Sequence, residues 1–282
     1  MVVALVAVGL SGCATWSNPD ARSTGLDAGL DPALERFVSA RAVPIWIPTG
    51  SPGAGGDISF QEMQAGQAAL ITEDGYALTA GHVVDAAAPA YTVHLKADPT
   101  KRVRAGRFFR GRVLLADADG AETAVPYSDL LMRPVRVVRR FDGVDVALIK
   151  TDFRPSETFP LASEPPHLGE MVAVALNPLK GRRETVAAGG VVGNGLFRRR
   201  ADSWRAYARC VAAQGDSGGP VVTEDGELVG VTVGAVYFRR PWRLLTGEWF
   251  DFRMDGASRA AVEQAIAGDR VSGGRREEPS GA

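Results

Sequence analysis

The stretch that decides the fold is Gln214-Gly215-Asp216-Ser217-Gly218-Gly219-Pro220. It places one serine hydroxyl among glycines, which permit a tight turn and leave room for a substrate to approach. Acyl transfer requires such an exposed hydroxyl beside main-chain N–H groups that converge on the developing oxyanion. We therefore expect Ser217 to be a nucleophile, and the N–H groups of Gly215 and Ser217 to form an oxyanion hole.

The order of the histidines along the chain discriminates between the folds that carry such a serine. The same residues fit the G-x-S-x-G pattern of α/β-hydrolases, but in that fold the histidine follows the serine. Here His82, His94 and His167 all precede Ser217. A subtilisin order would need an acid before His82, such as Asp74, which its Asp-Gly turn already explains. Both folds are therefore disfavoured.

A general base and an orienting carboxylate are expected from two other segments. His82 ends the run Leu-Thr-Ala-Gly-His, whose small residues allow a strand end to tuck the imidazole against a neighbouring barrel. Asp145 opens the apolar run Val-Ala-Leu-Ile, so its carboxylate is expected to be buried and to need a partner such as an imidazole N–H. Asp142 is the alternative, although its place before a glycine is typical of a turn. His94 and His167 are interpreted as surface or strand residues.

Taken together and in this order, TAGHVV, DVALI and GDSGGP resemble the trypsin/chymotrypsin superfamily, especially its bacterial members without disulfides. The resemblance covers residues 43–252. It implies an all-β fold of two six-stranded antiparallel β-barrels of the chymotrypsin type, with a short C-terminal helix and a catalytic triad between the barrels. It also implies a serine endopeptidase that forms an acyl-enzyme on Ser217, with His82 relaying the proton and Asp145 orienting the histidine. No cofactor or metal is implied.

The resemblance further implies where a specificity pocket would lie. In this superfamily the residue six before the nucleophile, here Val211, lies at the pocket base, and Ala212 and Gln214 follow it. The opposite wall is expected from Val233 and Gly234. No carboxylate stands at the base to pair with Lys or Arg. The expected preference is therefore for an apolar residue on the acyl side of the cleaved bond (P1).

Composition and the positions of Pro- and Gly-rich stretches divide the chain into segments. They predict a signal peptide at 1–12, a tether with a short helix at 13–42, a first β-barrel at 43–153, a linker at 154–166, a second β-barrel at 167–255, and a helix with a polar tail at 256–282. Thr-Glu-Asp-Gly occurs at 72–75 and again at 223–226, between apolar runs each time. Asp-Gly between apolar runs predicts a hairpin, so the repeat favours two related halves.

The first thirteen residues predict a lipid anchor. Their apolar run is too short to span a bilayer but suits a secretion signal. Its end, Leu10-Ser11-Gly12-Cys13, resembles the lipobox of bacterial lipoproteins, which implies cleavage before Cys13 and a diacylglycerol on its thiol. We expect the protein in the bacterial cell envelope, attached to a membrane through Cys13. A buried N-terminal strand or helix is the alternative. Cys210 is then left as the one other cysteine, so the fold must hold without a disulfide.

The remaining features point to a protein or peptide substrate as the partner. A net charge of −1 over 282 residues does not favour a nucleic acid. The basic and aromatic residues at 101–112 are interpreted as a solvated loop or a substrate-contact surface. Asp216 is expected to pair with a group such as an arginine, because no typical processed N-terminus precedes the first barrel. The alternative to an enzyme is a protease-like binding or scaffold lipoprotein that has lost catalysis.

Overall fold

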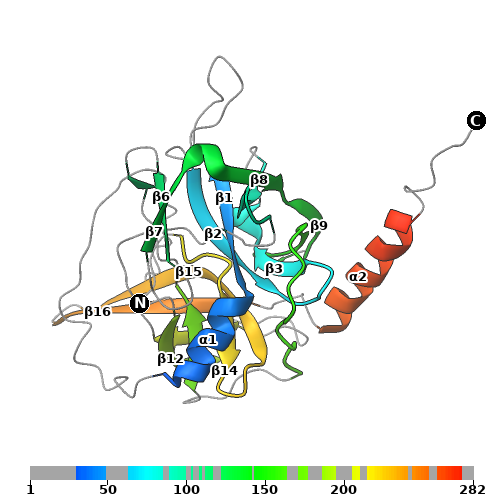
Figure 1. Cartoon of the computed structure of the whole chain (residues 1–282). Helices are drawn as coiled ribbons and strands as arrows, with labels where there is room; N and C mark the ends of the chain where they lie inside the picture. Colours follow the sequence, from blue (N-terminus) through cyan, green and yellow to red (C-terminus); the bar gives the residue numbers. More distant parts are fainter. Residues whose placement is uncertain are drawn as a thin grey trace, which may run out of the picture.

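Two antiparallel β-barrels with one helix at each end of the chain make up the structure, a computed structural model (Figure 1). It describes residues 30–48, 63–84, 89–99, 103, 108–109, 112–116, 122–141, 143–163, 171–176, 186–194, 205–209, 215–240, 243–253 and 259–274. The predicted fold class is confirmed.

A sheet of order β8-β4-β1-β2-β3-β10-β9 forms the first barrel. Its strands are β1 (Ala42–Pro48), β2 (Met63–Leu70), β3 (Tyr76–Ala80), β4 (Tyr91–Leu95), β8 (Leu130–Pro134), β9 (Arg136–Arg140) and β10 (Val146–Lys150). The two edge strands, β8 and β9, are consecutive in the chain and separated only by Val135. One bent strand therefore supplies both edges of the sheet, which closes it into a barrel of six strands.

A small sheet, which the sequence did not predict, lies between β4 and β8 in the chain. It consists of β5 (Phe108–Phe109), β6 (Arg112–Ala116) and β7 (Glu122–Pro126), joined in that order. A short 3₁₀ turn at Tyr127–Asp129 connects it to β8.

The second barrel is closed in the order β11-β12-β13-β16-β15-β14. Its strands are β11 (Met171–Ala175), β12 (Val186–Asn194), β13 (Arg205–Arg209), β14 (Pro220–Thr223), β15 (Leu228–Arg240) and β16 (Arg243–Arg253). Both barrels contribute to one apolar cluster, in which Leu78 and Leu148 of the first join Val222 and Leu228 of the second. The two halves are therefore packed through a shared core.

The repeated Thr-Glu-Asp-Gly segments form matching turns, one in each barrel. In both, the glycine N–H donates to the threonine carbonyl at 3.0 Å, and the glycine has a positive φ of 92° at Gly75 and 82° at Gly226. In both, the threonine hydroxyl accepts a hydrogen bond from the N–H of the residue after the glycine, at 3.0 and 3.2 Å. The expected hairpins thus have the same local chemistry in the two halves.

Each terminal helix packs on the barrel that is distant from it in sequence. Helix α1 (Pro32–Arg41) begins where Asp31 accepts a hydrogen bond from the N–H of Ala33, at 2.8 Å, and packs on β11 and β12. A Cβ on Gly226 would lie 3.0 Å from the Phe37 ring of α1, so the second hairpin contacts this helix. Helix α2 (Arg259–Gly274) lies beside β9 of the first barrel (Figure 1). Of the helices described, none is long and apolar enough to cross a membrane.

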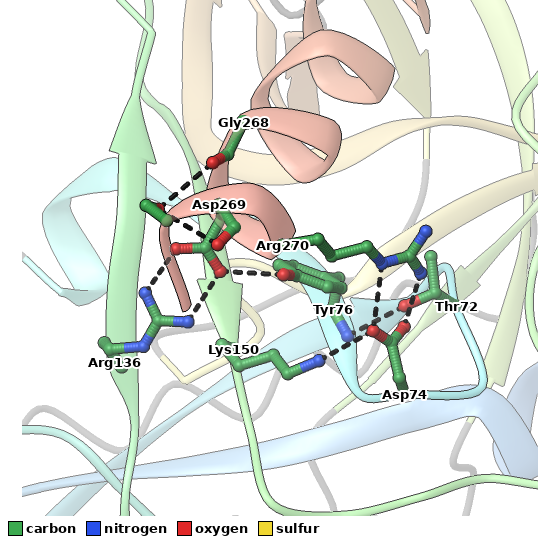
Figure 2. A network of polar contacts seen from close by, with 9 residues as sticks. Thr72, Asp74, Tyr76, Arg136, Lys150, Gly268, Asp269 and Arg270 are labelled. Atoms are coloured by element: carbon green, nitrogen blue, oxygen red, sulfur yellow. Dashed lines mark hydrogen bonds and ion pairs between the residues drawn. The ribbon is translucent and has the colours of Figure 1, made fainter. Parts of the chain in front are cut away.

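Ion pairs and hydrogen bonds fasten α2 to the first hairpin and its neighbouring strands (Figure 2). Asp269 receives two hydrogen bonds from Arg136, at 2.6 and 2.7 Å, and one from the Tyr76 hydroxyl at 2.7 Å. Asp74 accepts a hydrogen bond from Nη2 of Arg270 at 2.8 Å and forms an ion pair with Lys150 of β10 at 3.0 Å. These contacts hold the second half of α2, which runs to Gly274, against the first barrel.

This network predicts that α2 is docked most firmly between mildly acidic and mildly alkaline pH. Burial would raise the pKa of Asp74, but hydrogen bonds from Arg270 and other partners outweigh it and lower the pKa. The Arg136 hydrogen bonds lower the pKa of Asp269 to about 2. Burial, and then the hydrogen bond to Asp269, raise the pKa of Tyr76 to about 12.

The direction of each pKa shift decides in which pH range the group stabilises the docked helix. A lowered carboxyl pKa contributes stability above about pH 4, which is lost as the pH falls toward the folded value. A raised tyrosine pKa contributes stability below about pH 10, which is lost as the pH rises toward the folded value. We expect amide protection of α2, measured by hydrogen exchange, to decrease outside this window. The Asp269→Asn variant should lose less protection on the acid side; an unchanged acid-side loss would contradict the assignment.

Candidate active site

The pairing of β3 with β10 places His82 and Asp145 at the same end of the first barrel. The two strands are antiparallel, and Ala80 is opposite Val146. His82 follows the end of β3 in a 3₁₀ turn, and Asp145 immediately precedes β10. His82 and Asp145 are 63 positions apart in sequence. They become neighbours because both lie just beyond Ala80 and Val146, the last paired residues of β3 and β10.

Asp145 binds His82 at two points. Oδ2 lies 2.6 Å from Nδ1 of the imidazole, and Oδ1 accepts a hydrogen bond from the His82 main-chain N–H at 2.8 Å. The preceding Gly81 makes this approach possible, because a Cβ there would lie only 2.9 Å from Oδ1. The imidazole is 46% exposed, so the ring is held on one side and accessible on the other.

The environment of Asp145 favours its ionised form. Burial by itself would raise the pKa of this carboxyl. Hydrogen bonds and the charge interaction with the His82 side chain, together with main-chain N–H groups of Gly81 and His82, outweigh burial and lower the pKa below its usual value. A carboxylate in this state accepts a hydrogen bond from Nδ1 and leaves Nε2 of the ring as the basic nitrogen.

Ser217 lies in a tight turn that leads into β14. Gly215 and Gly218, on either side of it, have φ values of 100° and 81°, and the N–H of Gly219 closes the turn on the carbonyl of Asp216 at 2.9 Å. The positive φ values explain why glycine stands at both positions. The serine itself is partly exposed.

The His82 turn and the Ser217 turn meet at Gly66 of β2. A Cβ on Gly66 would lie 2.8 Å from a methyl carbon of Val83, the residue after His82, and 3.2 Å from the carbonyl oxygen of Ser217. Both turns thus pack on the same glycine. His82 is hydrogen bonded to Asp145, whereas the Ser217 hydroxyl makes no hydrogen bond to His82 within the described part of the chain.

The other expected site residues are described only in part. Gly215 and Val233 are half-buried, and Val233 packs against apolar clusters on both sides. Gly234 lies on β15 opposite Asp251. Asp216 is buried, with 1% of its surface exposed. Outside the described residues lie Cys13, Asp142, His167, Val211, Ala212 and Gln214.

Of the two interpretations of His94, a strand residue is confirmed and a surface residue is not. His94 does lie on a strand, β4, but only 2% of it is exposed. Its Nε2 is 2.9 Å from the hydroxyl of Thr92, another buried residue. His94 therefore belongs to the interior of the first barrel.

Comparison with known families agrees with this arrangement. A family model described as the trypsin-like peptidase domain matches residues 66–231, which include His82, Asp145 and Ser217. The chain belongs to the trypsin-like peptidase family. No curated protein sequence matches it.

Solved structures similar to this trypsin-like peptidase include two HtrA-type proteases. "HtrA-type protease AlgW with tripeptide" is 20% identical, with a TM-score of 0.50 over 83% of this chain and 63% of that protein. "HtrA-type protease AlgWS227A with tripeptide" is 19% identical, with a TM-score of 0.49 over 82% of this chain and 61% of that protein. The first likeness supports the fold. This chain spans less than two thirds of the length of either protein.

Two residues at the site of this trypsin-like peptidase were missed in the sequence. Gln67 and Thr79 are buried polar residues of β2 and β3, and both contact the turn that carries Ser217. The only signal for them was a polar side chain inside an otherwise apolar run, which is expected to need a hydrogen-bond partner.

Proposed function

We propose that this trypsin-like peptidase is an active serine endopeptidase, with Ser217 as nucleophile, His82 as general base and Asp145 as the orienting carboxylate. The observation that carries the proposal is the two-point contact of Asp145 with His82. The turn that follows His82 and the turn that carries Ser217 both pack on Gly66. The hydrogen bond that Nδ1–H of His82 donates to the Asp145 carboxylate leaves Nε2 unprotonated, so Nε2 can take the proton of the nucleophile, as general-base catalysis requires.

The proposed reaction proceeds through an acyl-enzyme. Ser217 Oγ attacks the scissile carbonyl carbon while Nε2 of His82 takes the hydroxyl proton. The tetrahedral oxyanion accepts hydrogen bonds from the N–H groups of Gly215 and Ser217. Protonated His82 then gives its proton to the departing amine, and the C–N bond breaks. In the second half, water attacks the ester carbon while His82 takes its proton. The ester C–O bond then breaks, His82 returns the proton to Ser217 Oγ, and the acid is released.

Labelling with a fluorophosphonate tests the proposal. The wild-type protein should be labelled at Ser217, because the reagent reacts with an activated serine hydroxyl, and Ser217→Ala should not be labelled. Ser128→Ala is the matched control: this serine is exposed, lies in the turn before β8, and should leave labelling unchanged. A wild-type protein that resists the reagent, or a label that persists in Ser217→Ala, would favour a binding or scaffold protein without catalysis.

We further propose that the enzyme prefers an apolar P1 residue. The support comes from the sequence, where Val211 and Ala212 occupy the expected base of the pocket and bring no charge. An apolar pocket without a carboxylate would bury the charge of a Lys or Arg side chain without a partner, which is unfavourable. A library of peptides varied only at P1 should be cut fastest after small or medium apolar side chains; fastest cleavage after Arg would refute this specificity.

We also propose that the protein is a lipoprotein of the bacterial cell envelope, attached to a membrane by a diacylglycerol on Cys13. The support is the apolar run that ends in Leu10-Ser11-Gly12-Cys13. The mass of the N-terminal peptide of the mature protein decides the question: cleavage before Cys13 with an added lipid supports the anchor, and an unmodified thiol contradicts it.

A further inference from the structure

The peptide unit that follows Ser217 is held at both of its polar ends. Its C=O, from Ser217, accepts a hydrogen bond from the main-chain N–H of Gln67 at 2.8 Å. Its N–H, from Gly218, donates to the carbonyl of Thr232 at 2.6 Å. Gln67 lies on β2 of the first barrel and Thr232 on β15 of the second. The backbone beside the serine is therefore fixed by both barrels together.

Gln67 connects this peptide unit to two other strands, β3 and β11. Its carbonyl accepts a hydrogen bond from the Thr79 hydroxyl at 2.6 Å, and Thr79 stands on β3 three residues before His82. Its side-chain Nε2 donates to the carbonyl of Ala175 at 3.3 Å, at the end of β11. Only 5% of Gln67 and none of Thr79 is exposed, so water does not replace these bonds.

The residues around these hydrogen bonds are packed so closely that there is no room for a side chain at Gly218 or Gly219. A Cβ on Gly218 would lie 2.0 Å from the Gln67 carbonyl oxygen and 2.3 Å from the Thr79 hydroxyl. A Cβ on Gly219 would lie 3.1 Å from Nε2 of Gln67. Gly218 thus lies against the Gln67 main chain and the Thr79 hydroxyl, and Gly219 against the Gln67 side chain, so a displacement of these groups moves the serine turn with it.

We propose that Gln67 and Thr79 are positioning residues that set the main chain of Ser217 relative to His82. The inference rests on the proposed function, because it concerns the reactivity of that serine. The link runs from β3, which leads into His82, through the Thr79 hydroxyl to the Gln67 carbonyl, and from the main-chain N–H of Gln67 to the Ser217 carbonyl. Fixing that carbonyl fixes ψ of Ser217, and with the turn it determines where Oγ points.

Isosteric variants separate positioning from general stability. Thr79→Val removes the hydroxyl at constant shape, and Gln67→Met removes the amide at nearly constant length. Both should slow fluorophosphonate labelling of Ser217 by about tenfold or more, since small misplacements of reacting groups are costly. Thr151→Val is the matched control. It makes the same exchange at a threonine that is equally buried, whose hydroxyl bonds Gly75 at the other end of the β3 and β10 pair. Its labelling rate should stay within about twofold of wild type.

Two further readouts distinguish a positioning role from loss of structure. In both variants kcat for a peptide ester should fall with little change in KM, and the pH midpoint of labelling should stay at the wild-type value, because the His82 and Asp145 pair is untouched. Thr79→Ser restores the hydroxyl and should restore most of the rate. Labelling of both variants at the wild-type rate, or an equal loss in Thr151→Val, would overturn the inference.

Failure of the proposed function gives a different result. An unreactive wild-type protein rejects catalysis, but hydrogen exchange then still tests the positioning. Amides of residues 215–219 should exchange faster in Thr79→Val and Gln67→Met than in Thr151→Val, because each of the two variants loses a hydrogen bond that fixes Gln67, whose main chain holds this turn. Equal exchange in all three variants would overturn the inference, whether or not the protein is a catalyst.

Discussion

Replacement of Asp145 by asparagine should lower kcat about 10⁴-fold at neutral pH, the loss expected when the catalytic histidine is held in the wrong tautomer. The two-point contact makes this outcome specific. An asparagine oxygen is needed where Oδ1 now accepts the His82 main-chain N–H at 2.8 Å. The amide nitrogen must then face Nδ1, which Oδ2 now contacts at 2.6 Å.

The reversed orientation of the asparagine is excluded by its chemistry. It would set two N–H donors against each other at the main-chain contact. With the amide nitrogen facing the ring, Nδ1 has to accept a hydrogen bond, and the imidazole proton moves to Nε2. A ring that carries its proton on Nε2 does not take one from Ser217.

Steady-state hydrolysis of a peptide ester provides the measurement. Asp74→Asn is the matched control, since it makes the same change at a hydrogen-bonded carboxylate at the other end of the first barrel. It should leave kcat within about twofold of wild type, because it touches neither the serine nor the histidine. A loss in Asp145→Asn no larger than in Asp74→Asn would show that the carboxylate does not orient the catalytic base.

The positions of His82 and Asp145 could be predicted because each follows from local strand signals. A histidine at the end of one apolar strand and an aspartate at the start of another meet whenever those two strands pair in antiparallel fashion. The sequence does not state that β3 and β10 are the pair. That step came from resemblance to a family, and the register of Ala80 opposite Val146 now supplies its physical reason.

Strand β1 was missed because two prolines interrupt its pattern. Residues 43–153 were assigned to the first barrel, but no strand was placed in the Pro- and Gly-rich sequence at its start. In the structure Ala42–Pro48 pairs with β2 over its whole length. Its other side registers with β4 only at Trp46. Strands with such limited pairing on one side tolerate proline, because few N–H donors are required there.

The hydrogen bonds of Gln67 could not be predicted for a different reason. They are made by its main chain and by a side chain in a run of small residues, and their partners lie 150 and 108 positions away. Residue type indicates that a polar side chain in an apolar run needs a hydrogen-bond partner, but the partner is known only once the barrels are placed against each other. The same holds for the docking of α2, in which Asp269 and Arg270 bind side chains of the first hairpin that are more than 190 positions away.

Replacement of Gly218 by alanine should destabilise the protein by about 3 kcal/mol or more, and should abolish labelling of Ser217. Two independent costs add at this position. Gly218 has a φ of 81°, where an L side chain is strained by roughly 1–2 kcal/mol. The new Cβ would also lie 2.0 Å from the carbonyl oxygen of Gln67, a main-chain atom inside a paired strand that cannot move aside.

Gly268→Ala is the matched control, because it adds the same methyl group at a glycine that has neither a positive φ nor a close neighbour. A Cβ on Gly268 meets nothing within 4 Å, and this residue lies in the interior of α2. Alanine there should stabilise the helix by about 0.5–1 kcal/mol. Thermal unfolding monitored by circular dichroism should therefore shift in opposite directions for the two variants. If Gly218→Ala unfolds like wild type and still reacts with the fluorophosphonate, then the serine turn does not lie against Gln67, and the proposed control of Ser217 by β2 is wrong as well.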